Sequence, residues 1–232
     1  MEPQVSVVMP MRDGERYLAD ALHSVVEQTT PAAEVLVVDD GSRDASPSIA
    51  AKFGHPVRVL RQGREGLAIA LNRGIAEASG DAVAFCDSDD ICTPHRLERQ
   101  VNALVRDPEC SIVGGLVQQF VSPDAIEATK GLRVDTRPTA VALNGSLMVR
   151  AEVFDLVGRF DTSLQTSVGI DWISRVRSFG LRVTLIDDVV LLRRVHGRNL
   201  GVVSRAQKHR DLISVVRAHR RRMHGTGDEP VG

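Results

Sequence analysis

The chain has 232 residues, of which 43% are hydrophobic and 25% are charged, and its formal net charge is −1. This length and composition are typical of one globular α/β domain, or at most two small domains, with enough apolar residues for a sizeable core. The balanced charge gives no global reason to expect binding to nucleic acid, and the aromatic content of 3% offers few platforms for stacking bases.

The N-terminus lacks the basic region, long apolar stretch and small-residue cleavage site of a signal peptide. No window approaches the roughly 20 apolar residues that cross a bilayer. The three cysteines, Cys86, Cys92 and Cys110, form no CxxC pair and are expected to be reduced, partly buried thiols. We therefore expect a cytoplasmic protein with at most peripheral membrane contact.

The first half of the chain alternates short apolar runs with helical patterns. Strands are predicted at 5–9, 34–38, 57–60 and 82–86, and helices at 17–28, 46–53 and 67–79. This alternation is typical of βαβ units around a parallel sheet, and a run such as VLVVDD suits a strand covered on both faces. In open sheets of this kind, ligands bind at the carboxyl ends of the strands.

The second half of the chain has a less regular pattern of apolar and polar residues. Helical patterns are predicted at 94–105, 151–157, 171–179 and 205–222, strands at 110–120 and 142–149, one or two strands over 183–192, and a polar loop or flap at 122–138.

Two acidic clusters stand at the ends of predicted strands. Asp87-Ser88-Asp89 ends one strand, and carboxylates at i and i+2 of an extended turn can reach one ligand, such as Mg²⁺ or Mn²⁺. A solvated acidic turn or a helix cap is the alternative. Asp39-Asp40 ends another strand and could accept hydrogen bonds from a nucleobase or a ribose hydroxyl, or simply build a turn. Two acidic strand ends in one sheet favour a nucleotide and metal site.

Three segments, in this order and spacing, resemble the family 2 glycosyltransferases of the GT-A fold: VSVVMPMRDGERYLADALHSVVEQ, VLVVDDGSRD and GLAIALNRGIAEASGDAVAFCDSDD. The resemblance implies an α/β, Rossmann-like GT-A fold with a mostly parallel sheet flanked by helices. It also implies an inverting, metal-dependent glycosyltransferase of the hexosyltransferase type. The expected domain covers 1–204, with a nucleotide-sugar half over 1–105 and an acceptor half over 106–204. A basic helix at 205–224 and a disordered tail at 225–232 are expected to follow.

The resemblance assigns several contacts to the donor nucleotide. Asp40, with Asp39 beside it, matches the carboxylate that binds the base, and Pro10 lies in the strand-end loop that approaches the base. Arg64 stands where the family has Asn in an N-x-G-x-x-x-A-x-N pattern that here continues to Asn72. An arginine at that position can reach a phosphate with two hydrogen bonds.

The same resemblance places a divalent cation, Mn²⁺ or Mg²⁺, at the acidic turn. Asp89 is implied to bind the metal, Asp87 to face the ribose or the sugar, and Ser88 to lie between them in the donor site. The metal would neutralise the diphosphate as it leaves.

The segment RRVHGRN at 193–199 resembles the late Tyr-Arg-x-His segment of the family, with Arg193 in place of the aromatic residue. The resemblance makes His196 the second candidate metal ligand. Arg194 and Arg198 are implied to contact the diphosphate.

The acceptor side resembles the family at two further segments. Asn144 begins an acceptor-side stretch, and Gly169-Ile170-Asp171-Trp172 resembles a Glu-Asp-aromatic motif at a helix start, with Ile170 in place of Glu. Asp171 is the implied general base, which would take the acceptor proton as the nucleophile attacks opposite the diphosphate. A carboxylate there also suits the helix start and its dipole. Trp172 could stack on the acceptor or pack in the core, and we favour the site.

The implied donor is a nucleoside-diphosphate sugar, with a UDP-sugar as first choice. The acceptor stays open among a peptide, a lipid-linked sugar and a small molecule, and the oligomeric state stays open too, a homodimer included. The basic helix at 205–222 is either a solvated face or a surface for anionic lipid, an acidic peptide or a partner protein. Because Ile170 and Arg64 depart from the family pattern, a non-catalytic nucleotide-sugar binder or scaffold is the alternative to an enzyme.

Overall fold

A computed structural model describes residues 2–132, 134–140, 144–199 and 205–224. Within them, nine strands form one sheet in the order β3-β2-β1-β4-β8-β6-β9-β5, with β7 paired to β6. The strands are β1 (Val5–Met11), β2 (Glu34–Asp40), β3 (Val57–Gln62), β4 (Ala82–Phe85), β5 (Ile91–Cys92), β6 (Cys110–Val121), β7 (Thr139–Ala140), β8 (Met148–Arg150) and β9 (Arg182–Val195). The helices are α1 (Leu18–Val26), α2 (Ser46–Ala51), α3 (Leu67–Glu77), α4 (Arg96–Arg106), α5 (Val153–Val157), α6 (Val168–Ser178) and α8 (Arg205–His224), and the 3-10 turns are η1 (Pro123–Ala125), η2 (Glu127–Thr129) and η3 (Asn144–Ser146).

The strands β3, β2, β1 and β4 run parallel, which confirms the predicted βαβ half. Val8 of β1 pairs with Leu36 of β2 on one side and with Phe85 of β4 on the other. These strands are therefore in step, and their carboxyl ends meet at one edge of the sheet. The residues of β1 and β4 are buried along their whole length, as expected for strands covered on both faces.

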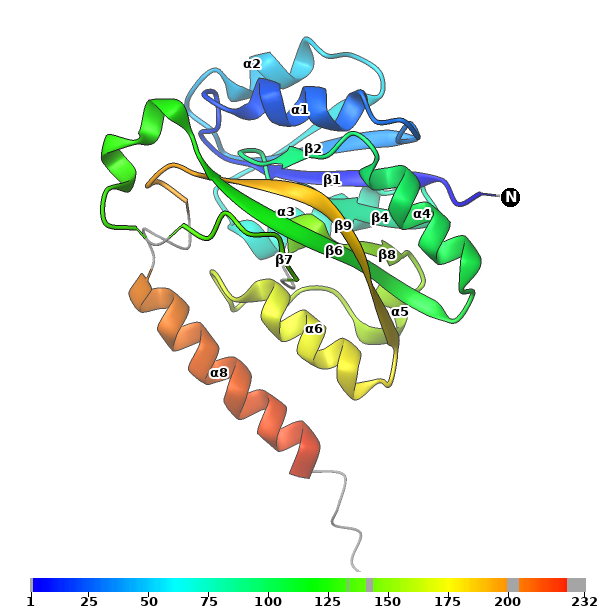
Figure 1. The fold of residues 1–232 in the computed structure, drawn as a ribbon. Coiled ribbons are helices and arrows are strands. Elements are labelled where there is room, and N and C mark those ends of the chain that lie inside the picture. The colour runs from blue at the N-terminus through cyan, green and yellow to red at the C-terminus, as the bar shows by residue number, and fades with distance from the viewer. Residues whose placement is uncertain (1, 133, 141–143, 200–204, 225–232) are drawn as a thin grey trace, which may run out of the picture.

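Helices cover both faces of the curled sheet (Figure 1). One core cluster joins the sheet to α1 and α4 through residues such as Leu22 and Leu104. The second cluster lies under the opposite face and joins the sheet to α3, α5 and α6, with Leu71, Phe154 and Trp172 among its members. Two apolar layers around one sheet confirm the predicted α/β fold.

The second half of the sheet is mixed. β8 runs antiparallel to both β4 and β6, whereas β9 runs parallel to β6. β9 is one strand of 14 residues rather than one or two shorter strands. Between the pairs Gly114–Leu185 and Leu116–Val189 its register with β6 shifts, so Asp187 and the residues beside it bulge out of the ladder. This bulge interrupts the apolar pattern from which the shorter strands were predicted.

The polar segment predicted as a flap at 122–138 begins with η1 and η2. Its Asp124 forms an ion pair with Arg16 and accepts a hydrogen bond from the hydroxyl of Tyr17 at 3.3 Å. This segment therefore lies against the loop that follows β1, on the side of the molecule where the parallel strands end.

α8 lies along α6 and is attached to it by polar and apolar contacts (Figure 1). Asp211, 4% exposed, accepts hydrogen bonds from the backbone N–H of Thr166 at 2.7 Å and from its hydroxyl at 2.8 Å. Val215 is buried in the second core cluster, and His219 Nδ1 lies 2.9 Å from the hydroxyl oxygen of Ser174. Asp211 thereby holds the loop that leads into α6, which begins at Val168, earlier than predicted.

The predicted domain limits at 105, 204 and 224 stay predictions. Of the basic side chains in α8, those of Arg210 and Arg217 lie in the described part of the chain. Residues 225–232, predicted to be disordered, lie outside it.

Replacing Asp211 by Asn tests the attachment of α8. Burial alone would raise the pKa of Asp211, but the hydrogen bonds from Thr166 outweigh it and lower that pKa below its ordinary value of 3.8. The stabilising contribution is therefore complete above pH 3.8 and disappears as the pH falls through the lower pKa of the folded state. We expect the variant to lose about 2 kcal/mol of unfolding free energy at pH 7 in urea titrations, because hydrogen bonds to a charged group are lost.

The loss of stability in the Asp211 variant should shrink at acidic pH. Asp155→Asn, at an exposed position of α5, is the matched control and should change stability little. An equal loss in both variants, or a loss that does not depend on pH, would contradict this role of Asp211.

Candidate functional site

The candidate site lies where β1, β2 and β4 end. Pro10 is inside β1 rather than in the following loop, and it pairs with Val38 of β2. It is two residues beyond Val8, whose carbonyl accepts a hydrogen bond from the N–H of Cys86 at 3.1 Å. The missing N–H of Pro10 therefore faces a side where pairing with β4 has already ended, so the strand can continue through the proline.

The carboxylates at the end of β2 are almost fully buried and hold the neighbouring loops. Asp39 accepts a hydrogen bond from the N–H of Ser42 at 2.9 Å, which closes the turn after β2. One oxygen of Asp40 accepts hydrogen bonds from Gln62 Nε2 at 3.0 Å and from the backbone N–H groups of Glu65 and Gly66 at 2.8 and 3.0 Å. Asp40 thus shapes the loop after β3.

Two basic residues, one from the loop after β1 and one from the loop after β3, lie toward solvent beside Asp40. The Arg12 guanidinium lies 3.6 Å from the second oxygen of Asp40, across from this loop. The side chain of Arg64, in the loop itself, is exposed. The two loops therefore present cationic groups beside a buried carboxylate, an arrangement suited to the polar and anionic parts of a nucleotide.

The acidic turn after β4 gathers three carboxylates. Oxygens of Asp87, Asp89 and Asp90 lie within 4.8 Å of one another. Burial, followed by repulsion from Asp89, raises the pKa of Asp87 to about 6, against the opposing charge of Arg193. Burial, with the charges of Asp89 and Asp87, also raises the pKa of Asp90 well above its ordinary value. Ser88 lies in the same turn, close to Gly14 of the loop after β1.

Asp89 is held in place by residues that follow β9. His196 Nε2 lies 2.9 Å from Asp89 Oδ2, and Asn199 Nδ2 donates to the same oxygen at 3.2 Å. Asn199 also accepts a hydrogen bond from the N–H of His196 at 3.0 Å, which fixes the loop that carries both residues. The structure thus brings together the two predicted metal ligands, Asp89 and His196, although they are far apart in the sequence. Asn199 ends the segment RRVHGRN, but the resemblance assigned it no role.

Arg194 is buried, and its side-chain nitrogens already have partners inside the protein. They donate to Asp20 Oδ2 at 3.0 Å, to the carbonyl of Asp89 at 3.0 Å and to the hydroxyl of Ser122 at 3.3 Å. The guanidinium also lies 4.5 Å from the ring centroid of Tyr17. The predicted contact with a diphosphate therefore does not suit Arg194, which instead braces the acidic turn.

Two neighbouring basic residues are better placed to meet an anion. Arg193 is half-buried, and its charge acts on both Asp87 and Asp90. It was missed as a site residue because it replaces an aromatic position of the family. Arg198 has an exposed side chain in the loop after β9, so its predicted contact with the diphosphate stays a prediction.

A buried arginine at the start of α4 contacts the strand that leads into the acidic turn. Arg96, 1% exposed, donates to the carbonyl of Phe85 at 2.8 Å and to Cys92 Sγ at 3.1 Å. Its charge partly offsets the rise in the pKa of Asp87. Cys86 and Cys92 flank the turn as free, buried thiols with their sulfurs 3.3 Å apart. Nothing in the sequence indicated these contacts, because an arginine in an amphipathic helix is expected to lie on the surface.

The acceptor-side segments lie next to the acidic turn. A Cβ on Gly145 would lie 3.7 Å from Asp87 Oδ2, and one on Gly169 would overlap Asn144 Oδ1 at 1.8 Å. η3 therefore lies between the acidic turn and the first turn of α6, and a side chain at 169 would displace the amide of Asn144. The amide oxygen of Asn144 is buried without a hydrogen-bond partner among the described residues, so it can accept one from a ligand.

Asp171 lies in the first turn of α6 and is 5% exposed. Its Oδ2 accepts a hydrogen bond from Arg175 Nε at 2.9 Å. Arg175 in turn donates to the carbonyl of Val157 at 2.9 Å and to that of Arg159 at 2.7 Å. The carboxylate is therefore held in a defined orientation, and its role as general base stays a prediction.

The expectation that Trp172 stacks on an acceptor is wrong. The side chain is fully buried, with its ring stacked on Phe154 at 5.1 Å and tilted against Phe160 at 5.6 Å. Its indole N–H donates to the carbonyl of Gly158 at 2.8 Å, which satisfies its single donor. Trp172 follows the candidate base in sequence, but adjacent helix residues point in different directions, here into the core.

The glycosyl transferase family 2 model matches residues 6–160, more than half of the chain. The chain belongs to glycosyl transferase family 2. AglE, a glycosyltransferase of Haloferax volcanii, is 31% identical over 81% of this chain and 66% of its own length. An uncharacterized glycosyltransferase of Rickettsia typhi is 28% identical over 84% of this chain and 64% of its own length. The chain spans 32% of the length of another relative, an uncharacterized glycosyltransferase of Rickettsia felis.

Similarity to solved structures shows that this chain has the GT-A fold. The mannosyltransferase PcManGT of Pyrobaculum calidifontis, in complex with GDP-Man and Mn²⁺, is similar with a TM-score of 0.70 and 22% identity over 99% of this chain and 66% of that chain. TarS of S. aureus, in complex with UDP-GlcNAc, has a TM-score of 0.66 and 20% identity over 84% of this chain and 61% of that chain. No helix in the described part of the chain is long and apolar enough to cross a bilayer.

The acidic turn fits a hard divalent cation. Three carboxylates are held close together, and burial followed by repulsion from Asp89 raises the pKa of Asp87, so a bound cation would stabilise the charged form of the turn. Carboxylate oxygens with an imidazole beside them match the ligands of Mn²⁺, and Mg²⁺ accepts the same oxygens.

Replacing Asp89 by Ala tests the metal site. We expect the dissociation constant for Mn²⁺, measured by calorimetry with the metal alone, to rise at least about tenfold, because the variant loses the carboxylate that His196 and Asn199 orient. Asp81→Ala is the control, since Asp81 precedes β4 at the opposite edge and binds the N–H of Gln4. Unchanged Mn²⁺ binding in the Asp89 variant would exclude the acidic turn as the metal site.

Proposed function

We propose that this glycosyltransferase transfers a sugar from a nucleoside-diphosphate sugar, with a UDP-sugar as first candidate, and inverts the anomeric centre. The observation that carries the proposal is the acidic turn of Asp87, Asp89 and Asp90 at the edge of the sheet where β1 and β2 also end. This edge of the sheet combines oxygen ligands for a divalent cation with a loop suited to a nucleotide. The structural neighbours in complex with UDP-GlcNAc and with GDP-Man and Mn²⁺ support the same donor class.

In this proposal the donor nucleotide lies against the loops after β1, β2 and β3. Asp40 holds the loop around Arg64, and Asp39 and Pro10 complete the base side of the site. Because the carboxylate of Asp40 is already engaged by backbone N–H groups, we assign it to shaping this loop as well as to contacting the base. Ser88 and Asp87 lie on the ribose and sugar side.

Asp89 and His196 would hold the divalent cation, Mn²⁺ or Mg²⁺, which when bound supplies charge neutralisation for the departing diphosphate. Arg193 and Arg198 add positive charge on the same side, because Arg194 is engaged within the protein. His196 is hydrogen-bonded to Asp89, so the imidazole is oriented before any ligand arrives.

The acceptor enters beside η3 and the first turn of α6. Asp171 acts as general base: it takes the proton of the acceptor hydroxyl or thiol as that atom attacks the anomeric carbon from the face opposite the diphosphate. Arg175 orients the carboxylate, and the unpartnered amide oxygen of Asn144 accepts a hydrogen bond from the acceptor or the sugar. Trp172 supports α6 from the core and does not contact the acceptor.

A thermal-shift panel of nucleotide sugars tests the donor class. We expect a UDP-sugar to raise Tm only when Mn²⁺ is present, because the metal links the diphosphate to the acidic turn. At a concentration about 100 times the dissociation constant, the stabilisation is about 2.7 kcal/mol, or roughly 5–10 °C for a chain of this size.

Each outcome of the panel has a defined meaning. A shift with GDP-sugars alone would reject a uridine donor and keep the enzyme class. The absence of any metal-dependent shift across the panel would contradict the proposal. Binding without slow hydrolysis of the donor would favour the non-catalytic binder.

Replacing Asp171 by Asn tests the general base. Asparagine keeps an oxygen that can accept from Arg175, so the fold is preserved while the basic group is lost. We expect donor hydrolysis, in which water replaces the acceptor, to fall about 10²–10⁴-fold. The metal-dependent thermal shift with the donor should remain close to that of the wild type.

Asp187→Asn, in the exposed bulge of β9, is the control and should hydrolyse the donor at the wild-type rate. Unchanged hydrolysis in the Asp171 variant would exclude this residue as the base. Loss of donor binding in the same variant would move its role to the donor site.

A further inference from the structure

The inner face of α8, which points toward α6, packs against the rest of the protein. Asp211 and Val215 are buried, and His219 contacts Ser174 of α6, so the inner face consists of residues at i, i+4 and i+8. Asp211 is the single acidic residue of the helix, and its carboxylate is engaged by the loop before α6. The orientation of α8 about its own axis is therefore fixed.

The outer face of α8 combines apolar and basic side chains. Ile213 and Val216 are 40% and 49% exposed, and Arg210 and Arg217 are exposed beside them. The four residues follow the spacing i, i+3, i+6 and i+7, so they form one stripe on the side away from Asp211. These apolar side chains lie on the solvent side of a helix whose other face already supplies its packing.

The charge of α8 is one-sided. The helix contains seven Lys or Arg residues and one acid, and that acid points inward. The stripe therefore has no acidic residue of its own helix to balance its arginines. The sequence of α8 also contains no Phe, Tyr or Trp, so it lacks the stacking groups used for single-stranded nucleic acid.

We propose that the outer face of α8 docks the enzyme on an anionic lipid bilayer. Ile213 and Val216 would enter the boundary between headgroups and acyl chains, while Arg210 and Arg217 would bind lipid phosphates, with their aliphatic stems along the apolar stripe. The attraction scales with the number of basic residues near an anionic surface. Apolar side chains between the arginines distinguish this surface from one that binds an acidic peptide by charge alone.

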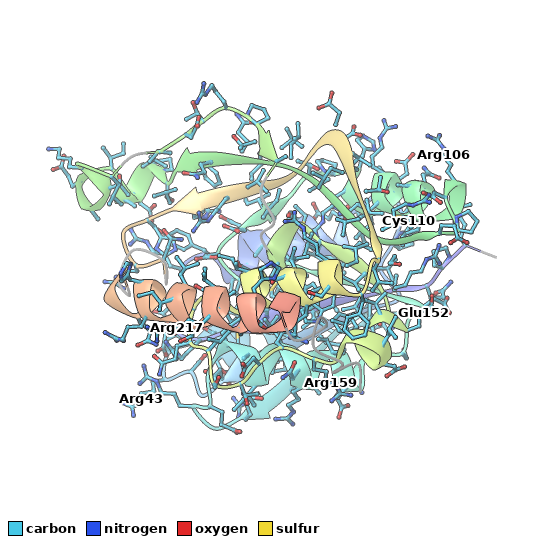
Figure 2. The ribbon with its side chains drawn as sticks, turned by 90° about the horizontal axis from the view of Figure 1, so that it is seen from below. Arg43, Arg106, Cys110, Glu152, Arg159 and Arg217 are labelled. Carbon is cyan, nitrogen blue, oxygen red and sulfur yellow. The ribbon has the colours of Figure 1, made fainter. Side chains whose placement is uncertain are left out.

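The position of α8 suits such docking. Figure 1 shows the helix at the outside of the molecule, beneath α6, with its first turn toward the side where β1 and β2 end. In Figure 2, viewed from below, α8 lies toward the viewer and carries Arg217. A bilayer on this face would lie beside the element that carries Asp171, on the proposed acceptor side.

The chain supplies a matched control for the test. On α4, Val105 and Arg106 form the same Val-Arg pair as Val216 and Arg217, and the valines are 52% and 49% exposed. Figure 2 shows Arg106 and Arg217 in separate parts of the molecule. A double substitution at either pair makes the same change in charge and apolarity, but only one pair lies on α8.

The experiment is co-flotation of the full chain with vesicles, either of phosphatidylcholine alone or of phosphatidylcholine with phosphatidylglycerol. The wild type should float with the anionic vesicles and stay in the soluble fraction with the neutral ones. Val216→Asp with Arg217→Glu should lower partitioning at least about tenfold, because each basic residue contributes about 1 kcal/mol at such a surface. Val105→Asp with Arg106→Glu should bind like the wild type.

Circular dichroism and thermal melting of every variant report whether it is folded. The milder Arg217→Gln, expected to lower partitioning about fivefold, replaces the double variant if that variant does not fold. The proposal is overturned if the wild type stays soluble with anionic vesicles, which would leave the face to solvent or a protein partner. It is also overturned if neutral vesicles bind equally well, or if the α4 variant loses binding as much as the α8 variant. Co-flotation measures lipid binding alone, so its outcome does not depend on the proposed transfer reaction.

Discussion

The repulsion among three carboxylates at the end of β4 shapes much of this molecule. Asp87, Asp89 and Asp90 lie within 4.8 Å of one another, and like charges at such distances must be balanced by hydrogen-bond donors or cations. The protein supplies part of that balance: the N–H of Arg194 donates to Asp90, and His196 and Asn199 face Asp89. Burial and the charge of Asp89 still raise the pKa of Asp87, and a divalent cation would offset both effects.

The donors that face the acidic turn come from the end of β9 and the loop after it, so the length of this strand brings them to the site. It pairs with β6 from the far edge of the sheet to the site, despite the bulge near Asp187. At its end Arg194 spans the gap between the acidic turn and Asp20 of α1. A strand that stopped earlier would leave the carboxylates without these partners.

Two glycines allow the proposed metal site and the proposed acceptor side to lie close together. Gly145 lies against Asp87, and Gly169 lies against Asn144, so η3 fits between the acidic turn and α6 without side chains in the way. The start of α6 is then held from outside by Asp211 of α8. The position of Asp171 therefore depends on contacts from three segments that are distant in sequence.

The sequence was informative where local pattern and chemistry coincide. The alternation of apolar strands and amphipathic helices predicted the parallel half of the sheet, and Asp87-Ser88-Asp89 predicted the acidic turn, because these features depend on neighbours in the chain. The burial of Trp172 and the inward partners of Arg194 depend on packing between distant elements, so the pattern around each residue misled the prediction. Arg96 and Asn199 were assigned no role, although each contacts the acidic turn or the strand before it.

The contacts of β9 bear on how relatives should be compared. The family match ends at residue 160, whereas the side chains that orient Asp89 stand at 196 and 199. The match to the family model thus covers the acidic turn but not the side chains that orient Asp89. A comparison limited to residues 6–160 leaves these two side chains out, so determinants of ion preference should be sought in the last strand and the loop after it as well as in the acidic turn.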